Sequence, residues 1–98
     1  MKIGIVITRA ANLDVTWTTI HLAVAALEAG HVVRFVERDA FEVDERASLV
    51  ARAFAFDEPT SAALMVRGLR TRTARRVYAD MRKLDRLLLR SAPLTPAA

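Results

Sequence analysis

The sequence contains no cysteine and only two histidines, His21 and His31. Without cysteine the chain has no disulfide, no thiol nucleophile and no thiolate metal site, and two histidines are too few for a typical structural zinc site. No apolar run approaches the ~20 residues that span a bilayer, and no small-residue cleavage site follows the N-terminus. These absences predict a cytoplasmic protein that holds no metal and does not enter a membrane.

Glycine is also scarce, since the chain has only Gly4, Gly30 and Gly68. A P-loop or a dinucleotide-binding turn needs several glycines at fixed spacing, and neither spacing occurs here. Phosphoryl transfer also needs groups that neutralise charge on the phosphate, usually with a metal ion, and the sequence offers no candidate set. We therefore expect no catalytic residues and no cofactor within this chain.

The composition, 53% hydrophobic and 27% charged, is typical of a globular protein, and the length suits one domain over residues 1–98. Residues 2–8 form a short apolar run rich in β-branched side chains, as in a strand buried on both faces. Apolar residues then recur at helical spacing, Gly30 supplies a helix end, and residues 32–36 predict a second strand. Such a βαβ unit is parallel and right-handed, and its ligand side lies at the carboxyl ends of the strands.

Residues 41–56 predict a small β-hairpin, because apolar and polar residues alternate there around a turn; the several alanines would also suit a helix. A helix then follows, capped by Thr60 or Ser61. Gly68 can split that helix in two. Its apolar stripe would contain Val66, Leu69, Thr73, Val77, Met81 and Leu84.

Residues 84–90 are ambiguous on physical grounds alone. The leucines could extend the preceding helix, because Met81, Leu84 and Leu88 keep the helical spacing. They could equally form a short buried strand that ends before Pro93.

Four stretches nevertheless occur in a characteristic order: a loop with Asn12, then Leu27-Glu28-Ala29-Gly30-His31, Val50-Ala51-Arg52-Ala53, and the run from Leu84 to Pro93. Their order and spacing resemble the N-terminal domain of prokaryotic glutathione synthetases, the Rossmann-like domain that precedes an ATP-grasp domain. The resemblance implies an α/β fold of the pre-ATP-grasp type, with a small Rossmann-like parallel sheet, flanking helices and a β-hairpin insertion. It also favours a strand for the leucine run, so that the parallel core would contain residues 3–8, 32–37 and 87–90.

In functional terms, the resemblance implies the substrate-side domain of an ATP-dependent carboxylate-amine ligase, not catalytic by itself. ATP and magnesium would belong to a C-terminal ATP-grasp domain, so the chain would be a fragment or truncated form of a larger ligase. We also expect a homo-oligomer, because a domain without its neighbour keeps exposed apolar surface. The sequence departs from the family at Val15-Thr16-Trp17-Thr18 and at Arg90-Ser91-Ala92-Pro93. Both changes remove charge where a substrate would lie, so γ-glutamylcysteine itself is not implied.

Six polar residues are candidates for substrate binding, because they lie at or after the carboxyl ends of the predicted parallel strands: Thr8, Arg9, Asn12, Thr16, Arg90 and Ser91. Arg90, at a predicted strand end, is the leading candidate. Ordinary turn and capping chemistry also accounts for the polar residues of the first loop.

Basic residues gather between positions 67 and 86, and the sequence pI is about 10.6. A solvated helix face is the simplest interpretation; a surface for an acidic partner and a contact with nucleic acid are alternatives. Only Tyr78 is placed to stack on a base, which disfavours nucleic acid. A second functional hypothesis therefore stays open: a stand-alone α/β interaction module without catalysis, which binds a partner through the basic helix and an exposed sheet edge.

Overall fold

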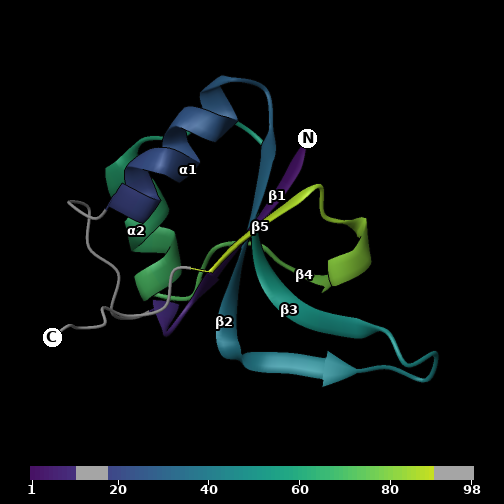
Figure 1. Cartoon of the computed structure of the whole chain (residues 1–98). Coiled ribbons are helices and arrows are strands. Elements are labelled where there is room, and N and C mark those ends of the chain that lie inside the picture. Colours follow the sequence, from purple (N-terminus) through teal and green to yellow (C-terminus); the bar gives the residue numbers. More distant parts are fainter. Residues whose placement is uncertain (11–17, 90–98) are drawn as a thin grey trace, which may run out of the picture.

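A computed structural model describes residues 1–10 and 18–89 of the chain (Figure 1). These residues form a mixed α/β fold with one sheet, two α-helices and a short 3₁₀ turn. Neither α-helix is long and apolar enough to cross a bilayer. In chain order the elements are β1 (Lys2–Ile7), α1 (Thr18–Glu28), β2 (Val32–Val43), β3 (Leu49–Phe56), α2 (Ala62–Arg70), β4 (Arg76–Asp80), η2 (Met81–Lys83) and β5 (Arg86–Leu89).

The five strands of the sheet lie in the order β4-β3-β2-β1-β5. β1 pairs in parallel with both β2 and β5, whereas β3 pairs antiparallel with both β2 and β4. Of the expected parallel core of residues 3–8, 32–37 and 87–90, the pairing is confirmed over residues 3–7, 32–37 and 87–89, and Thr8 lies just beyond the end of β1. The leucine run is a strand and does not extend a helix.

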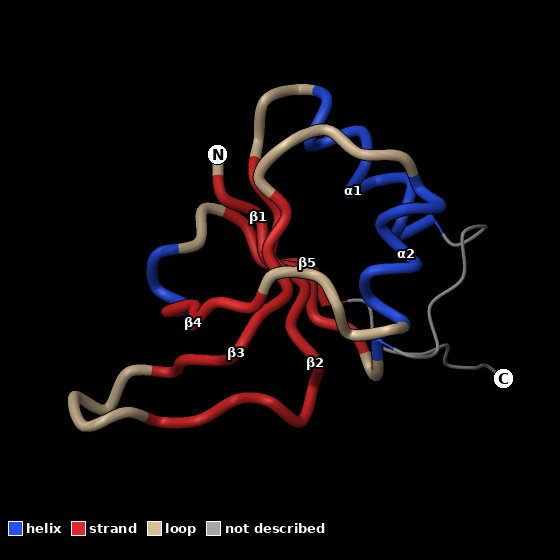
Figure 2. Tube along the Cα trace, turned by 180° about the vertical axis from the view of Figure 1, so that it is seen from behind, coloured by secondary structure: helices blue, strands red, loops and turns tan. Residues whose placement is uncertain are grey.

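Both helices lie against the same face of the sheet (Figure 2). Successive side chains of a strand point to opposite faces, so alternate residues of β1, β2 and β3 meet the helices. The resulting cluster contains the largest fully buried side chains of the described residues and is the main core. Its members include Ile5, Ile7, Ile20, Leu27, Phe35, Phe54, Met65 and Leu69.

The end of α1 follows the sequence prediction. Gly30 has a φ of 92°, in the left-handed region that glycine adopts without a steric penalty. Its N–H donates to the carbonyl of Leu27 (3.1 Å), and the N–H of His31 donates to the carbonyl of Ala26 (3.0 Å). This pair of hydrogen bonds is a Schellman cap, and it returns the chain so that Val32 begins β2 beside Lys2.

β2 turns a corner between its two halves (Figure 1). Val36 lies opposite Ala53 on β3, but the next pair joins Phe41 to Ala51, so residues 37–40 of β2 face a single residue of β3. The antiparallel pairing begins at Val33, earlier than the hairpin predicted for residues 41–56. A bulge of this kind bends the strand and re-aims its side chains.

The long basic helix predicted after Ser61 is wrong beyond residue 70. Ser61 does cap α2, since its hydroxyl accepts a hydrogen bond from the N–H of Leu64. The helix stops at Thr71, whose hydroxyl donates to the carbonyl of Arg67 (2.6 Å), and Arg72 then takes a positive φ of 59°. Val77 and Tyr78 follow in β4, because β-branched and aromatic residues pair well on a sheet. The stripe expected from Val66 to Leu84 therefore does not exist.

The other face of the sheet carries smaller side chains. Its buried cluster consists of Val36, Ala51, Ala53 and Ala79, with Met81 packed against it. Neither described α-helix covers this face, and η2 connects β4 at one edge of the sheet to β5 at the other.

Candidate functional site

The bulge in β2 opens a cavity of about 320 Å³ at the carboxyl ends of β1 and of the parallel half of β2. Thr8 and Arg9 directly follow β1, and the bulge itself contributes acidic side chains. Two further arginines come from the turn after α2 and from the first residue of β4. In all, the cavity is lined by Thr8, Arg9, Glu37, Asp39, Ala40, Arg72 and Arg76.

Glu37 connects the two sides of this cavity. Its Oε2 accepts a hydrogen bond from the N–H of Ala10 (2.8 Å) and another from Nη1 of Arg72 (2.9 Å). Burial alone would raise the pKa of Glu37, but the hydrogen bonds from Arg72 and Ala10 outweigh it and lower the pKa below 4.5, the ordinary value. The same contact raises the pKa of Arg72. Glu37 is therefore ionised at neutral pH and positions both the loop after β1 and Arg72.

Arg72 and Arg76 both lie over the ring of Phe54, with Cζ atoms 5.3 Å and 4.5 Å from its centroid. Such stacking holds a guanidinium in place through cation–π attraction. The Nε of Arg76 is buried and has no hydrogen-bond partner among the described residues. A buried donor without a partner costs free energy, and because this Nε is closed off from solvent, a ligand would have to approach Arg76 at its terminal nitrogens.

The charges of the cavity have both signs, three guanidiniums and two carboxylates. Such a set matches a zwitterion, with the carboxylate of the ligand near Arg76 and its ammonium near Asp39. The cavity is thus suited to binding and orienting a ligand.

Of the candidate residues from the sequence, Thr8 and Arg9 are brought together at this cavity. Asn12, Thr16, Arg90 and Ser91 lie outside the described residues. Sequence reasoning missed Glu37, Asp39, Arg72 and Arg76. Glu37 could have been found, because it directly follows the apolar run of the second strand, at the edge where ligands bind in parallel sheets; the arginines could not, because their place depends on the end of α2.

The basic residues of positions 67–86 do not lie on one helix. Arg67 and Arg70 belong to α2, Arg82 to η2 and Arg86 to β5, while Arg75 pairs with Asp57. No group of three His, Asp or Glu side chains within residues 1–10 and 18–89 is arranged to hold a metal ion.

Comparison with known proteins leaves the family open: no protein-family model matches the chain, and no curated protein matches it at a significant level. The geometry of the cavity and the sequence resemblance are therefore the features that point to a function.

Proposed function

We propose that the chain is the substrate-side domain of a glutathione synthetase-like ATP-grasp ligase, not catalytic by itself and active in the cytoplasm. Three features support the proposal. β2, β1 and β5 form a parallel set in the order of a small Rossmann-like sheet. β2 and β3 pair antiparallel in the part of the chain where the resemblance implies a hairpin, and the elements follow one another in the order that the resemblance implies.

The observation that carries the proposal is the position of the zwitterion-compatible cavity at the carboxyl ends of β1 and the first half of β2. Open α/β sheets bind their ligands at this edge. In the proposed role, Arg76 binds a carboxylate of the amino-acid or peptide substrate, while Asp39 faces its ammonium. ATP and magnesium would be supplied by a C-terminal ATP-grasp domain, since the chain has no phosphate-cradling loop.

Titration of the ¹⁵N-labelled chain with γ-glutamyl dipeptides and free glutamate tests this role. We expect saturable shifts of the amide signals of Thr8, Arg9 and Glu37. The dissociation constant should be millimolar, because part of the proposed site would belong to the ATP-grasp domain. Arg76→Gln should abolish these shifts, whereas Arg67→Gln on α2 removes the same charge elsewhere and should leave them unchanged. The absence of saturable shifts with all these ligands would contradict the proposal.

Calorimetry with Mg-ATP tests the division of labour between the domains. We expect no saturable heat at millimolar nucleotide, because neither a glycine-rich loop nor a Walker spacing is present. A micromolar dissociation constant would instead reveal an autonomous nucleotide-binding function and would overturn the assignment of ATP to another domain.

A second candidate function, a stand-alone interaction module, is favoured by exposed apolar side chains on the strands. Val43 and Leu49 form a cross-strand pair next to the turn between β2 and β3, with 69% and 44% of their surface exposed, and Tyr78 on edge strand β4 is 66% exposed. Paired apolar side chains and an open sheet edge are typical of association surfaces. We propose a homo-oligomer that strengthens with salt as repulsion between the basic chains is screened. Sedimentation across a salt series tests it: a monomer at every salt concentration would contradict the self-association.

A further inference from the structure

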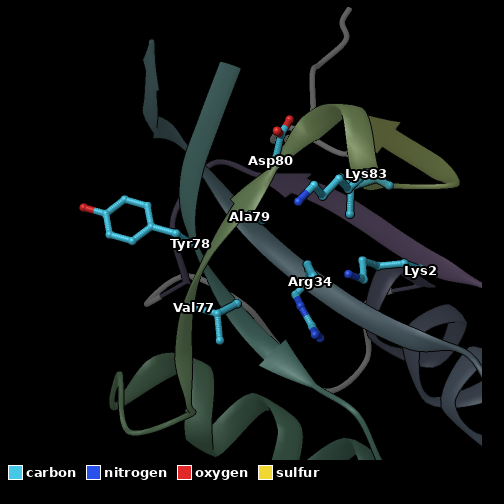
Figure 3. A pocket seen from close by; sticks show the side chains of 8 residues that line it. Lys2, Arg34, Val77, Tyr78, Ala79, Asp80 and Lys83 are labelled. Atoms are coloured by element: carbon cyan, nitrogen blue, oxygen red, sulfur yellow. The ribbon is translucent and has the colours of Figure 1, made fainter. Parts of the chain in front are cut away.

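A second cavity, of about 280 Å³, lies on the side of the sheet opposite the helices (Figure 3). Its walls come from the start of β1, from β2, from β4 and from the end of η2. Three cationic side chains line it, Lys2, Arg34 and Lys83, together with the apolar side chains of Val77 and Leu84. Figure 3 shows Tyr78 pointing to the other side of β4, away from these cations. The proposed substrate cavity at the β2 bulge shares none of these residues.

The two lysines of this cavity are the only lysines in the chain, among fifteen basic residues. They are far apart in sequence, yet their side chains extend toward the same space beside β4 (Figure 3). Neither lysine forms an ion pair among the residues that the structure describes. The chain thus brings both of its lysines to one cavity, where Lys2 and Lys83 attract the carboxylates of Asp57 and Asp80 without forming an ion pair among the described residues.

Two nearby carboxylates, Asp57 and Asp80, are bound to arginines, and the carboxylate of Asp85 accepts a hydrogen bond from the backbone N–H of Lys2 (2.7 Å). Asp57 accepts a hydrogen bond from Nη1 of Arg34 (2.6 Å) and also pairs with Arg75, and hydrogen bonding from Arg34 leads the lowering of its pKa. Asp80 pairs with Arg82 through two further contacts. Arg34 donates to Asp57 and to the Val33 carbonyl through Nη1 in both cases. Its other N–H donors make no hydrogen bond with described residues.

Backbone packing explains why the cavity forms. Lys2, Gly4 and Arg34 lie on the same face, since Gly4 is paired in register with Arg34. A side chain at Gly4 would begin only 2.4 Å from Cδ1 of Leu84, so glycine lets the segment after η2 come down onto the sheet. That approach brings Lys83 over β4 and closes the cavity above Arg34.

We propose that this cavity binds a phosphoryl group, either of a small phosphomonoester or of inorganic phosphate. The two ammonium groups and the unused donors of Arg34 would surround the phosphate oxygens, which accept strong charge-assisted hydrogen bonds from such cations. Asp80 is the only acidic residue in the lining, against three cations. The lining therefore has an excess of two positive charges, which matches a dianion. The side chains of Val77 and Leu84 form an apolar wall beside the cations, and the apolar part of a phosphomonoester would pack there.

The two lysines make the test direct, because a chain labelled with ¹³C at lysine Cε gives only two lysine signals. We titrate it with inorganic phosphate and with phenyl phosphate at constant pH and ionic strength, with chloride as the reference salt. Both signals should shift together and saturate with one dissociation constant. Tighter binding of phenyl phosphate identifies a phosphomonoester as the ligand, and equal binding identifies free phosphate.

Variants separate a built site from general screening. Lys83→Gln should weaken binding about ten-fold or more, followed on the Lys2 signal, because one charge-assisted contact is lost. Lys83→Arg keeps the charge and should retain most of the affinity, which also controls for folding. Arg67→Gln removes one charge from α2 on the other side of the sheet and should change nothing. Shifts that never saturate, or equal weakening by Arg67→Gln and Lys83→Gln, would overturn the proposal.

Discussion

Two neighbouring cross-strand pairs show how differently the two faces of the sheet are built. Phe35 and Phe54 are opposite each other and fully buried beneath α1 and α2. One residue further along β2, Val36 lies opposite Ala53 and points to the other face. The fully buried aromatic rings thus lie on the helix-covered face, whereas the buried side chains of the face that η2 crosses are smaller and the ring of Phe41 there is only partly buried.

This contrast indicates that the two faces have different roles: the first contributes stability, and the second is suited to recognition. Large rings on the first face bury the most apolar area, which is the dominant favourable term in folding. Small residues on the second face let η2 approach the sheet, and the cations Lys2 and Lys83 then lie together beside it. We infer that the first face holds the fold together while the second face provides space for a ligand.

The largest expected effect on stability comes from truncating a buried aromatic side chain of the first face. Phe35→Ala should lower the free energy of unfolding by about 3–5 kcal/mol, because it removes a fully buried ring and leaves a cavity. Val36→Ala, the matched change on the second face, should cost about 1–2 kcal/mol for two buried methyl groups. Urea unfolding of both variants measures the difference. Equal losses would show that the two faces contribute alike and would break the comparison.

The sequence predicted an element correctly where the pattern of neighbouring residues was strong enough to specify it. The run of residues 2–8 and the cap at Gly30 are signals that depend only on neighbouring residues, and the structure confirms both. The strand over the leucine run was predicted from the resemblance to a family, because leucine itself favours a helix and the local pattern left both structures open. Its pairing with β1 depends on contacts across more than 80 residues, which no local pattern contains.

The error after Arg70 has a physical cause of the same kind. Val77 keeps the helical spacing, yet pairing with Ala53 on β3 outweighs the weak intrinsic preference of the segment for a helix. Because that strand begins at Arg76, both Arg72 and Arg76 reach the cavity at the β2 bulge. The side of this cavity contributed by the α2–β4 segment was therefore hidden from the sequence, whereas Thr8 and Arg9 could be placed at its edge because they directly follow the first predicted strand.

A smaller effect is expected where the crossing segment touches the second face. Gly4→Ala places a Cβ against Leu84, and such overpacking typically costs about 1–3 kcal/mol. The double variant Gly4→Ala with Leu84→Ala should show a favourable coupling, because the second change makes room for the first. A double-mutant cycle by urea unfolding measures this term. If the two changes in the free energy of unfolding were strictly additive, contact between Leu84 and Gly4 would not be what holds η2 against the sheet.

The smallest effect concerns the bulge that bends β2 between Val36 and Phe41, and it depends on pH. The pKa of Glu37 is lowered in the folded chain, so its ionised form stabilises the fold above the ordinary value of 4.5. That contribution is lost as the pH falls from 4.5 toward the lower folded pKa. The ion pair with Arg72 is partly exposed to solvent, so its contribution should be below about 1 kcal/mol.

Comparison of the native chain with Glu37→Gln measures this contribution. The difference in the free energy of unfolding should be constant from pH 6 to 8, shrink below pH 4.5, and diminish in high salt. Glu42→Gln, an exposed carboxylate on the same strand, controls for the general loss of negative charge. A difference between the native chain and Glu37→Gln that grows on acidification would mean that Glu37 is destabilised by burial. The bulge would then be held by backbone pairing alone, and the hydrogen bonds of Ala10 and Arg72 to Glu37 would not order the cavity.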